Sequence, residues 1–111
     1  MTLHCENISF TDLAGQFGTP LYVYSQSALT EAFCAYTSAF STLSPLVCYA
    51  VKANGNLSLL KHFAALGSGF DIVSGGELAR VLAAGGDAGK TIFSGVGKSE
   101  AEIEFALNAG V

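Results

Sequence analysis

The sequence contains few charged residues. Of its 111 residues, 13% are Asp, Glu, Lys or Arg and 50% are hydrophobic, whereas ordinary soluble domains carry roughly 25% charged residues. Intrinsic disorder is excluded, because disordered chains combine low hydrophobicity with high charge. Small domains have proportionally more surface to cover with polar residues. The shortage of charge therefore indicates elements buried on more than one side, and we expect the chain to be part of a larger protein.

Long hydrophobic runs, basic clusters and a signal peptide are also missing. The longest unbroken apolar run, residues 46–51, is far shorter than the ~20 residues of a membrane-spanning helix. The formal net charge is -4, with five Lys and Arg against nine Asp and Glu, and it supplies no basic face for nucleic acid. The N-terminus has neither the basic nor the apolar region of a secretory signal. We therefore expect no membrane and no nucleic-acid partner.

The cysteines and histidines do not form a recognisable framework. Three cysteines, Cys5, Cys34 and Cys48, are odd in number and widely spaced, which favours free thiols in a reducing cytoplasm. His4 with Cys5, and His62, lack a second pair of ligands at metal-binding spacing. No metal site is expected.

From residue 46 onward the sequence repeats one plan, in which a short apolar run and a turn precede a segment with helical periodicity. The strand starts are 24 and 21 residues apart, a spacing typical of parallel strands joined by right-handed helical crossovers. The first apolar run is continuous, which predicts a strand buried on both faces. The expected strands are 46–51, 70–73 and 91–94, and the expected helices lie between Asn56 and Gly67, over 77–84 and over 99–109, the last with a capping box of Ser99 and Glu102.

These three units predict an α/β fold with a parallel sheet. An eight-unit (β/α)8 TIM barrel takes about 250 residues, so the chain fits the first part of such a barrel. The alternative is a complete small three-layer α/β domain. Before residue 46 we expect a turn and short helix over 7–17 capped by Thr11, a strand over 21–24, and an amphipathic helix over 27–41.

Two segments imitate a phosphate-binding loop. Residues 89–91 and 97–99 read Gly-Lys-Thr and Gly-Lys-Ser, but the pattern G-x-x-x-x-G-K-[ST] also requires a glycine five residues earlier. This sequence has Ala84 and Ile92 there. An anion at the helix start beside Ser99 remains open on dipole grounds.

Lys52 is the cation with the most informative position. It directly follows the first predicted strand, at the C-terminal mouth where α/β sheets place their chemistry. Apolar neighbours there would partly desolvate the amine and favour its neutral, nucleophilic form, which is suited to a Schiff base with an aldehyde or ketone. The alternative is a strand-end lysine that extends its amine to water.

Two carboxylates follow on the next unit. Asp71 lies inside a predicted strand, where a carboxylate is costly unless it is paired, and we expect its partner to be Lys52 or a group that Lys52 carries. The alternative is an aspartate that caps a neighbouring turn. Glu77 lies in the first turn of a helix and is expected to interact with the helix dipole.

Four segments carry a family resemblance: 17–25, 49–54 (Tyr-Ala-Val-Lys-Ala-Asn), 69–78 and 93–98. In this order they resemble the alanine-racemase-like barrel decarboxylases that use pyridoxal 5'-phosphate. The wording of 69–78 is most similar to members that act on meso-diaminopimelate.

The resemblance implies an enzyme, a PLP-dependent carboxy-lyase of lysine biosynthesis that converts meso-diaminopimelate to L-lysine. It implies that Lys52 is the catalytic residue bound to the cofactor aldehyde, with Asp71 and Glu77 near the cofactor. Residues 1–25 would associate with a C-terminal β-domain and residues 26–111 would open the PLP-binding (β/α)8 barrel. The full-length protein would be a cytoplasmic homodimer, and the 111 residues alone would be inactive.

Three alternatives stay open. The chain is similar to other barrel enzymes with the same lysine, the decarboxylases of ornithine, arginine or carboxynorspermidine and alanine racemase. A non-catalytic PLP carrier built on a lone barrel, or a small α/β binding domain, would also keep part of the pattern. For the fragment, we expect exposed apolar surface at residues 110–111 and along 21–24.

Overall fold

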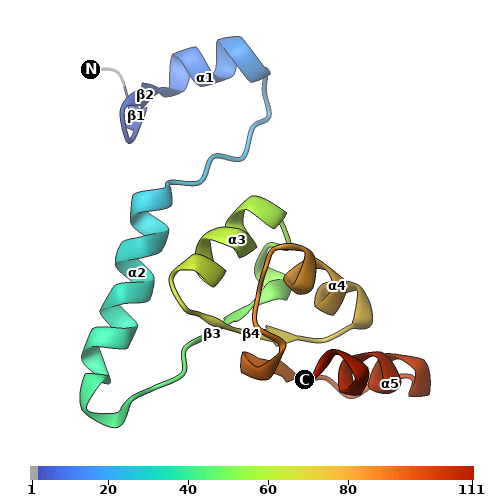
Figure 1. Cartoon of the computed structure of the whole chain (residues 1–111). Coiled ribbons are helices and arrows are strands. Elements are labelled where there is room, and N and C mark those ends of the chain that lie inside the picture. Colours follow the sequence, from blue (N-terminus) through green and yellow to red (C-terminus); the bar gives the residue numbers. More distant parts are fainter. Residues whose placement is uncertain (1–2) are drawn as a thin grey trace. The chain divides into compact units, whose positions relative to one another are not determined.

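A computed structural model describes residues 3–111, which divide into two compact units. The first unit ends at Ala35 and the second comprises Tyr36–Val111. Helix α2 (Gln26–Ala39) crosses the boundary between them. Figure 1 shows the elements of each unit along the chain.

The first unit begins with a short hairpin that the sequence pattern did not predict. Strand β1 (His4–Cys5) pairs antiparallel with β2 (Ile8–Ser9), and α1 (Phe10–Phe17) follows at once. The expected cap, Thr11, is wrong. Ser9 is the N-cap, because it is the last extended residue and its hydroxyl accepts a hydrogen bond from the Asp12 N–H at 3.0 Å.

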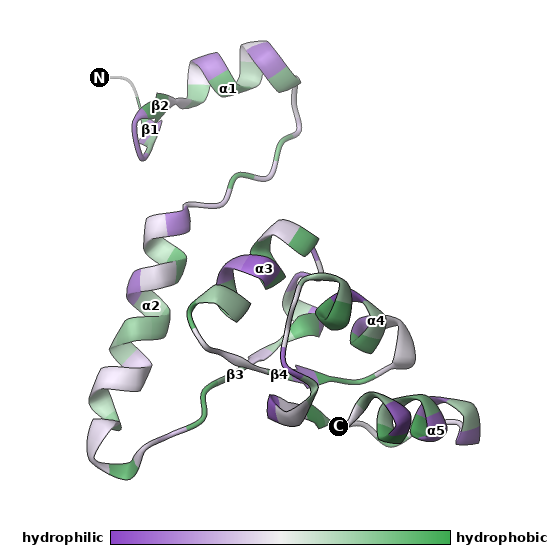
Figure 2. Cartoon of the chain, in the orientation of Figure 1, coloured by the Kyte–Doolittle hydropathy of each residue, from purple (hydrophilic) through white to green (hydrophobic). Residues whose placement is uncertain are grey.

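The predicted strand over 21–24 is wrong, because the structure has no β-ladder at these residues. A strand forms only where its N–H and C=O groups find a partner strand. The expected exposure of this segment is confirmed, and the Tyr22 side chain is 88% exposed. The expected helix over 27–41 is present as α2, and no residue of either α1 or α2 is buried. Figure 2 shows hydrophobic and hydrophilic residues interspersed along both helices.

The second unit is a three-stranded parallel sheet with helical connections, as predicted. Its strands lie in the order β3 (Cys48–Ala50), β4 (Gly69–Ile72), β5 (Thr91–Phe93). The helices are α3 (Leu57–Ala65), α4 (Gly75–Ala83) and α5 (Glu100–Ala109), and short 3₁₀ turns occur at Ser41–Leu43, Val51–Ala53 and Ala88–Lys90.

The helix ends follow the sequence signals closely. The Asn56 side chain caps α3 by accepting from the Ser58 N–H at 2.9 Å, and Gly67 ends this segment with a φ of 84°. The capping box of α5 is complete, with Ser99 and Glu102 each bonded to the other's backbone N–H. These three predictions are confirmed.

The core lies on one face of the sheet. Phe70 and Ile72 of β4 are fully buried, and by strand alternation they face away from Asp71. On the same face Tyr49 of β3 stacks on Phe63 of α3 with ring centroids 4.4 Å apart. Figure 1 shows α3 and α4 beside the sheet, and their buried residues complete this core: Leu59, Leu60, Phe63, Leu78 and Val81.

The opposite face of the sheet is open within this unit. The residues of β3 are only half-buried, and Ile92 of β5 is 53% exposed. The expectation of a first strand buried on both faces is therefore wrong for these residues, because no element of this unit covers the second face. At the C-terminal end Val111 is half-buried, and the exposed apolar side chains lie along α5 instead: Ile103, Phe105 and Leu107. None of the helices in residues 3–111 has the length and apolar content to cross a membrane.

Candidate functional site

Lys52 lies where β3 ends. After Ala50 the chain leaves the sheet in the 3₁₀ turn Val51–Ala53, which places Lys52 at the C-terminal edge of the parallel strands. Val51 is 1% exposed and anchors the turn in the core, while the Lys52 side chain is exposed. The expected partial desolvation of this amine is therefore not provided by residues 3–111. An exposed amine at this edge remains accessible to a carbonyl compound.

Asp71 lies on the neighbouring strand, in register with Ala50 of β3 and Ile92 of β5. It is half-buried on the open face of the sheet. The Ser94 hydroxyl donates a hydrogen bond of 2.5 Å to Asp71 Oδ1, so the bond that Asp71 makes is to a hydroxyl instead of the expected cation. No hydrogen bond to Oδ2 is found among the described residues, which leaves this oxygen available to a ligand.

Ser94 lies in the candidate site, and the sequence reasoning missed it. Its N–H donates to the Ile72 carbonyl at 2.8 Å, so the backbone pairing of β4 and β5 continues to this residue. Ile92 is the register partner of Asp71, and side chains two residues apart on a strand share a face. The sequence signal that could have identified Ser94 is its position two residues after Ile92, which places its hydroxyl on the sheet face that carries Asp71.

Glu77 holds the loop between β4 and α4. Its carboxylate Oε2 accepts a hydrogen bond of 2.7 Å from the Val73 N–H, and its own N–H donates to the Ser74 hydroxyl at 3.2 Å. Both contacts fix the backbone directly after Asp71. The carboxylate also lies in the first turn of α4, where negative charge is favourable.

The loop between β5 and α5 is fixed by its own side chains. Lys98 Nζ donates to the Gly95 carbonyl at 2.7 Å and lies 5.1 Å from the Phe93 ring centroid. The N–H of Ser99 donates to Glu102 Oε2 at 3.0 Å, and Glu100 adds a second carboxylate in the first turn of α5. These carboxylates occupy the position that the sequence left open for an anion, and their negative charge opposes one there.

Cys48 lies on the open face beside Asp71. Burial, and then the negative charge of Asp71, raise the pKa of the Cys48 thiol, which keeps it protonated at neutral pH. It behaves as a small packing residue at this edge. Gly69, its register partner, leaves it room, because a Cβ there would lie 2.6 Å from Cys48 Sγ.

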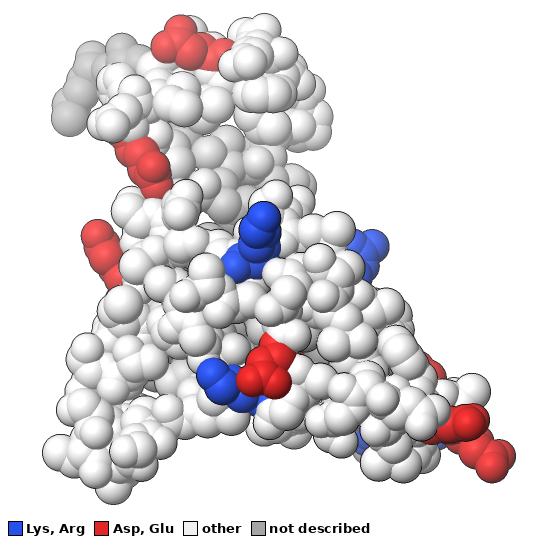
Figure 3. All heavy atoms as spheres, in the orientation of Figure 1, with Lys and Arg blue, Asp and Glu red and all other residues white. Residues whose placement is uncertain are grey.

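Figure 3 shows that most of the visible face of the molecule carries no charged side chain. The blue atoms of Lys and Arg are separated from one another on that face, and no basic patch is seen on it.

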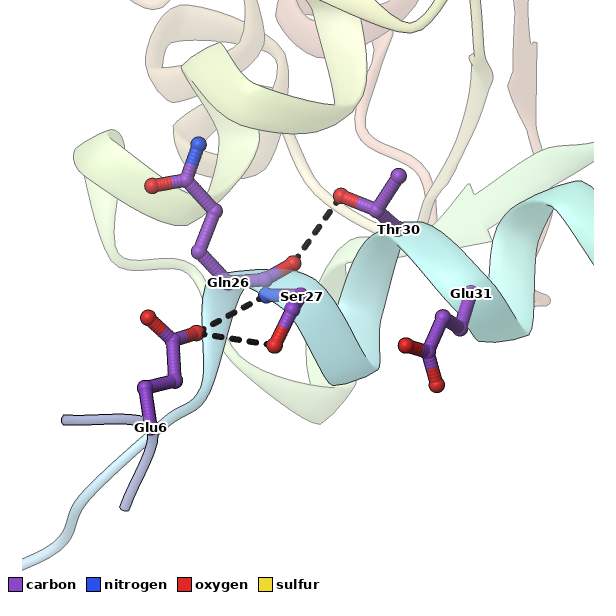
Figure 4. Close-up of a pocket in the computed structure, with 5 residues that line it drawn as sticks. All are labelled: Glu6, Gln26, Ser27, Thr30 and Glu31. Atoms are coloured by element: carbon purple, nitrogen blue, oxygen red, sulfur yellow. Dashed lines mark hydrogen bonds between the residues drawn. The ribbon is translucent and has the colours of Figure 1, made fainter.

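A separate hollow of about 420 Å³ lies in the first unit, at the start of α2 (Figure 4). Its lining residues are Glu6, Gln26, Ser27, Thr30 and Glu31. Glu6 Oε1 accepts from the Ser27 N–H at 2.9 Å and from the Ser25 hydroxyl at 2.8 Å. These bonds lower the pKa of Glu6 and make it the cap of α2. The hollow thus lies where Glu6 of the β1–β2 hairpin caps the start of this helix, and this structural contact accounts for its polar lining.

Comparison with known proteins gives the family. Residues 26–111 match the family described as pyridoxal-dependent decarboxylase, pyridoxal binding domain, and the chain belongs to this family. The diaminopimelate decarboxylase of Neisseria meningitidis serogroup A is 83% identical over all 111 residues, which make up 27% of that protein.

Solved structures of diaminopimelate decarboxylases are also similar to this chain. The crystal structure of diaminopimelate decarboxylase from M. jannaschii in complex with L-lysine has a TM-score of 0.95 and 34% identity, over 99% of this chain and 27% of that one. The corresponding Helicobacter pylori enzyme, complexed with L-lysine, has a TM-score of 0.88 and 45% identity, over 92% of this chain and 26% of that one. The chain thus spans about a quarter of the length of the relatives it matches.

The family binds pyridoxal, in agreement with the cofactor that the sequence motifs implied. The residues at the sheet edge fit such a group. Lys52 offers an exposed amine for the aldehyde, and Asp71 presents a carboxylate oxygen with no hydrogen bond from the described residues on the open face of the adjacent strand.

Proposed function

We propose that this chain is the N-terminal part of an enzyme that removes one carboxylate of meso-diaminopimelate as CO₂ and forms L-lysine. The observation that carries the proposal is the 83% identity to the Neisseria meningitidis enzyme along the whole chain. The parallel sheet then represents the first part of a (β/α)8 barrel, and residues 1–25 associate with a C-terminal β-domain.

Lys52 is the proposed catalytic residue. Its exposed amine, beside the buried Val51, would hold the cofactor through the cofactor's aldehyde. Pyridoxal 5'-phosphate, when bound, supplies an electron sink for the pair left by the departing carboxylate. Replacement of the carboxylate by a proton completes the conversion.

Asp71 and Glu77 are proposed to shape the cofactor site beside Lys52. The Ser94 hydroxyl fixes one oxygen of Asp71, and the other oxygen would be available to the cofactor. Glu77 fixes the loop after β4 through the Val73 N–H. The homodimer and the cytoplasmic location remain predictions, as does the inactivity of the 111 residues alone.

The test is a substrate comparison with the full-length protein that contains this chain, loaded with pyridoxal 5'-phosphate. Equal amounts of CO₂ and L-lysine are expected from meso-diaminopimelate. Ornithine and arginine are expected to react with kcat/KM lower by roughly 100-fold or more, because a site that bonds the second carboxylate of diaminopimelate rejects analogues that lack it. Faster release of CO₂ from ornithine or arginine would assign a different decarboxylase, and cofactor binding without turnover of any amino acid would favour a carrier.

A further inference from the structure

Two loops at the C-terminal edge of the sheet are each bonded by a charged side chain from the following βα unit. The first loop, residues 53–56, comes directly after Lys52. Arg80 of α4 donates a hydrogen bond of 3.2 Å from its guanidinium to the Gly55 carbonyl in this loop. The Tyr49 hydroxyl donates to the Asn54 carbonyl at 3.3 Å from the strand side.

The second loop, residues 73–76, lies between Asp71 and Glu77 and includes the first two residues of α4. Glu102 of α5 accepts a hydrogen bond of 2.8 Å at Oε1 from the Gly75 N–H. Its other oxygen, Oε2, accepts from the Ser99 N–H at 3.0 Å and from the Ser99 hydroxyl at 2.9 Å. One carboxylate thus joins the start of α5 to the start of α4.

The backbone residues at both contacts are glycines. A Cβ on Gly75 would lie 3.2 Å from Glu102 Cγ, and a Cβ on Gly55 would lie 3.4 Å from Arg80 Cδ. The first approach is tighter than ordinary van der Waals contact, and the second is at its limit. The loops therefore bring bare backbone to the charged side chains of the next helix.

We propose that Arg80 and Glu102 are positioning residues for the lysine and carboxylates of the cofactor site. Arg80 fixes the loop that follows Lys52, and Glu102 fixes the loop between Asp71 and Glu77. Neither side chain needs to touch substrate or cofactor. The catalytic consequence of this inference rests on the proposed function. The two contacts do not, because both partners of each contact lie within these residues.

Charge strengthens both contacts. A guanidinium donor and a carboxylate acceptor form shorter and stronger hydrogen bonds with backbone groups than neutral side chains do. Positioning matters because a displacement of about 1 Å in a reacting group costs on the order of 100-fold in rate. The first loop is fixed at the Gly55 carbonyl and the second at the Gly75 N–H. Both groups lie close in sequence to the residues of the proposed site.

The experiment compares two variants of the full-length protein, Arg80→Met and Glu102→Met, which keep an unbranched apolar side chain and remove the bonding groups. The controls are Lys61→Met on α3 and Glu104→Met on α5, exposed residues without a role in these loops. Amide hydrogen exchange is measured without cofactor or substrate. In Arg80→Met alone, the amide exchange rate over 53–56 is expected to rise about tenfold. In Glu102→Met alone, the same rise is expected over 73–76, because the loss of a contact lowers local stability.

A second readout separates positioning from folding. With cofactor and substrate present, kcat is expected to fall about tenfold or more in both variants with little change in KM, while the unfolding temperature changes by no more than about 4 °C. Glu102→Gln, which keeps one carbonyl acceptor, is expected to recover part of the loss. Ser99→Ala, which removes the helix cap and leaves the Gly75 contact, is expected to leave exchange over 73–76 near the wild-type rate.

Exchange that stays unchanged in each variant's own loop, or that rises equally in both loops, would overturn the proposal. A kcat loss no larger than that of the Lys61 and Glu104 variants would do the same. If the wild-type protein decarboxylates no amino acid, the proposed function fails, and the exchange measurement still reports on the two contacts.

Discussion

Gly86 shows how closely single residues pack behind the proposed site. A Cβ at this position would lie 2.5 Å from Val81 Cγ1 and 2.8 Å from Phe70 Cε2, and both of these side chains are fully buried. Gly86→Ala is therefore expected to lower the free energy of unfolding by about 1–3 kcal/mol, the usual cost of overpacking a core. Equilibrium denaturation in urea measures the change.

Gly97 is the matched control for this substitution. Nothing lies within 4 Å of a Cβ built there, and its φ is not in the left-handed region. Gly97→Ala is expected to change the free energy of unfolding by less than about 0.5 kcal/mol. Equal losses from the two substitutions would show that the contacts at Gly86 relax without cost.

At the same scale, sequence reasoning predicted the positions of some residues of the candidate site and missed others. Lys52 was placed correctly after the first strand of the sheet and Asp71 inside the second, because an apolar run indicates where a strand lies and where it stops. The contacts of Ser94 and Arg80 were not predicted, and Glu102 was predicted only as part of the α5 capping box, not for its bond to the Gly75 N–H. Their partners are set by strand register and by helix positions, and single-sequence periodicity determines neither.

At the scale of elements, the start of α3 offers a direct test of a sequence signal. The Asn56 side chain accepts from the Ser58 N–H, so Asn56→Ala leaves a helix N–H without its cap. The expected loss is about 1 kcal/mol in the free energy of unfolding. In Ser58→Ala the capping N–H remains, and a loss as large as that of Asn56→Ala would contradict the assigned cap.

The start of α5 predicts a pH dependence. Hydrogen bonds from the backbone of Gly75, then of Ser99, lower the pKa of Glu102 from its ordinary value of 4.5. A carboxyl with a lowered folded pKa stabilises the protein above its unfolded pKa and loses that contribution as the pH falls through the folded value. The stability difference between wild type and Glu102→Met should therefore be full at pH 7 and shrink below pH 4.5.

Thermal unfolding of both proteins between neutral and acid pH measures this difference. A gap that grows on acidification would have the wrong sign for an ionised Glu102 bonded to N–H groups. Glu104→Met, on the same helix, controls for the general loss of one negative charge.

The elements differ in how far the sequence predicted them. The three βα units were predicted well because each combines a strand run, a turn and a capped helix, so several local signals agree. The hairpin of β1 and β2 was missed, because strands of two residues carry no periodicity. The strand over 21–24 was predicted from apolar composition alone, but a strand also needs a partner, and none lies among the described residues.

At the scale of the whole molecule, the low charge has a structural counterpart. One face of the sheet packs against α3 and α4, while the other exposes Ile92 and half-exposes β3. Exposed apolar residues also lie along residues 21–24 and along α5. Surface of this kind is typical of interaction with further protein, which agrees with a chain that spans about a quarter of its relatives. The sequence predicted this shortage of polar cover and the exposure along 21–24, but not the open face of the sheet or the exposed apolar residues of α5.

The most direct measurement locates the cofactor on the chain. The full-length protein is loaded with pyridoxal 5'-phosphate, treated with borohydride to make a lysine–cofactor bond permanent, digested, and analysed by mass spectrometry. The mass increment is expected on the peptide that contains Lys52, and it should vanish in Lys52→Ala but persist in Lys61→Ala. An increment on a different lysine, or its survival in Lys52→Ala, would contradict the assignment of Lys52 as the residue that binds the cofactor.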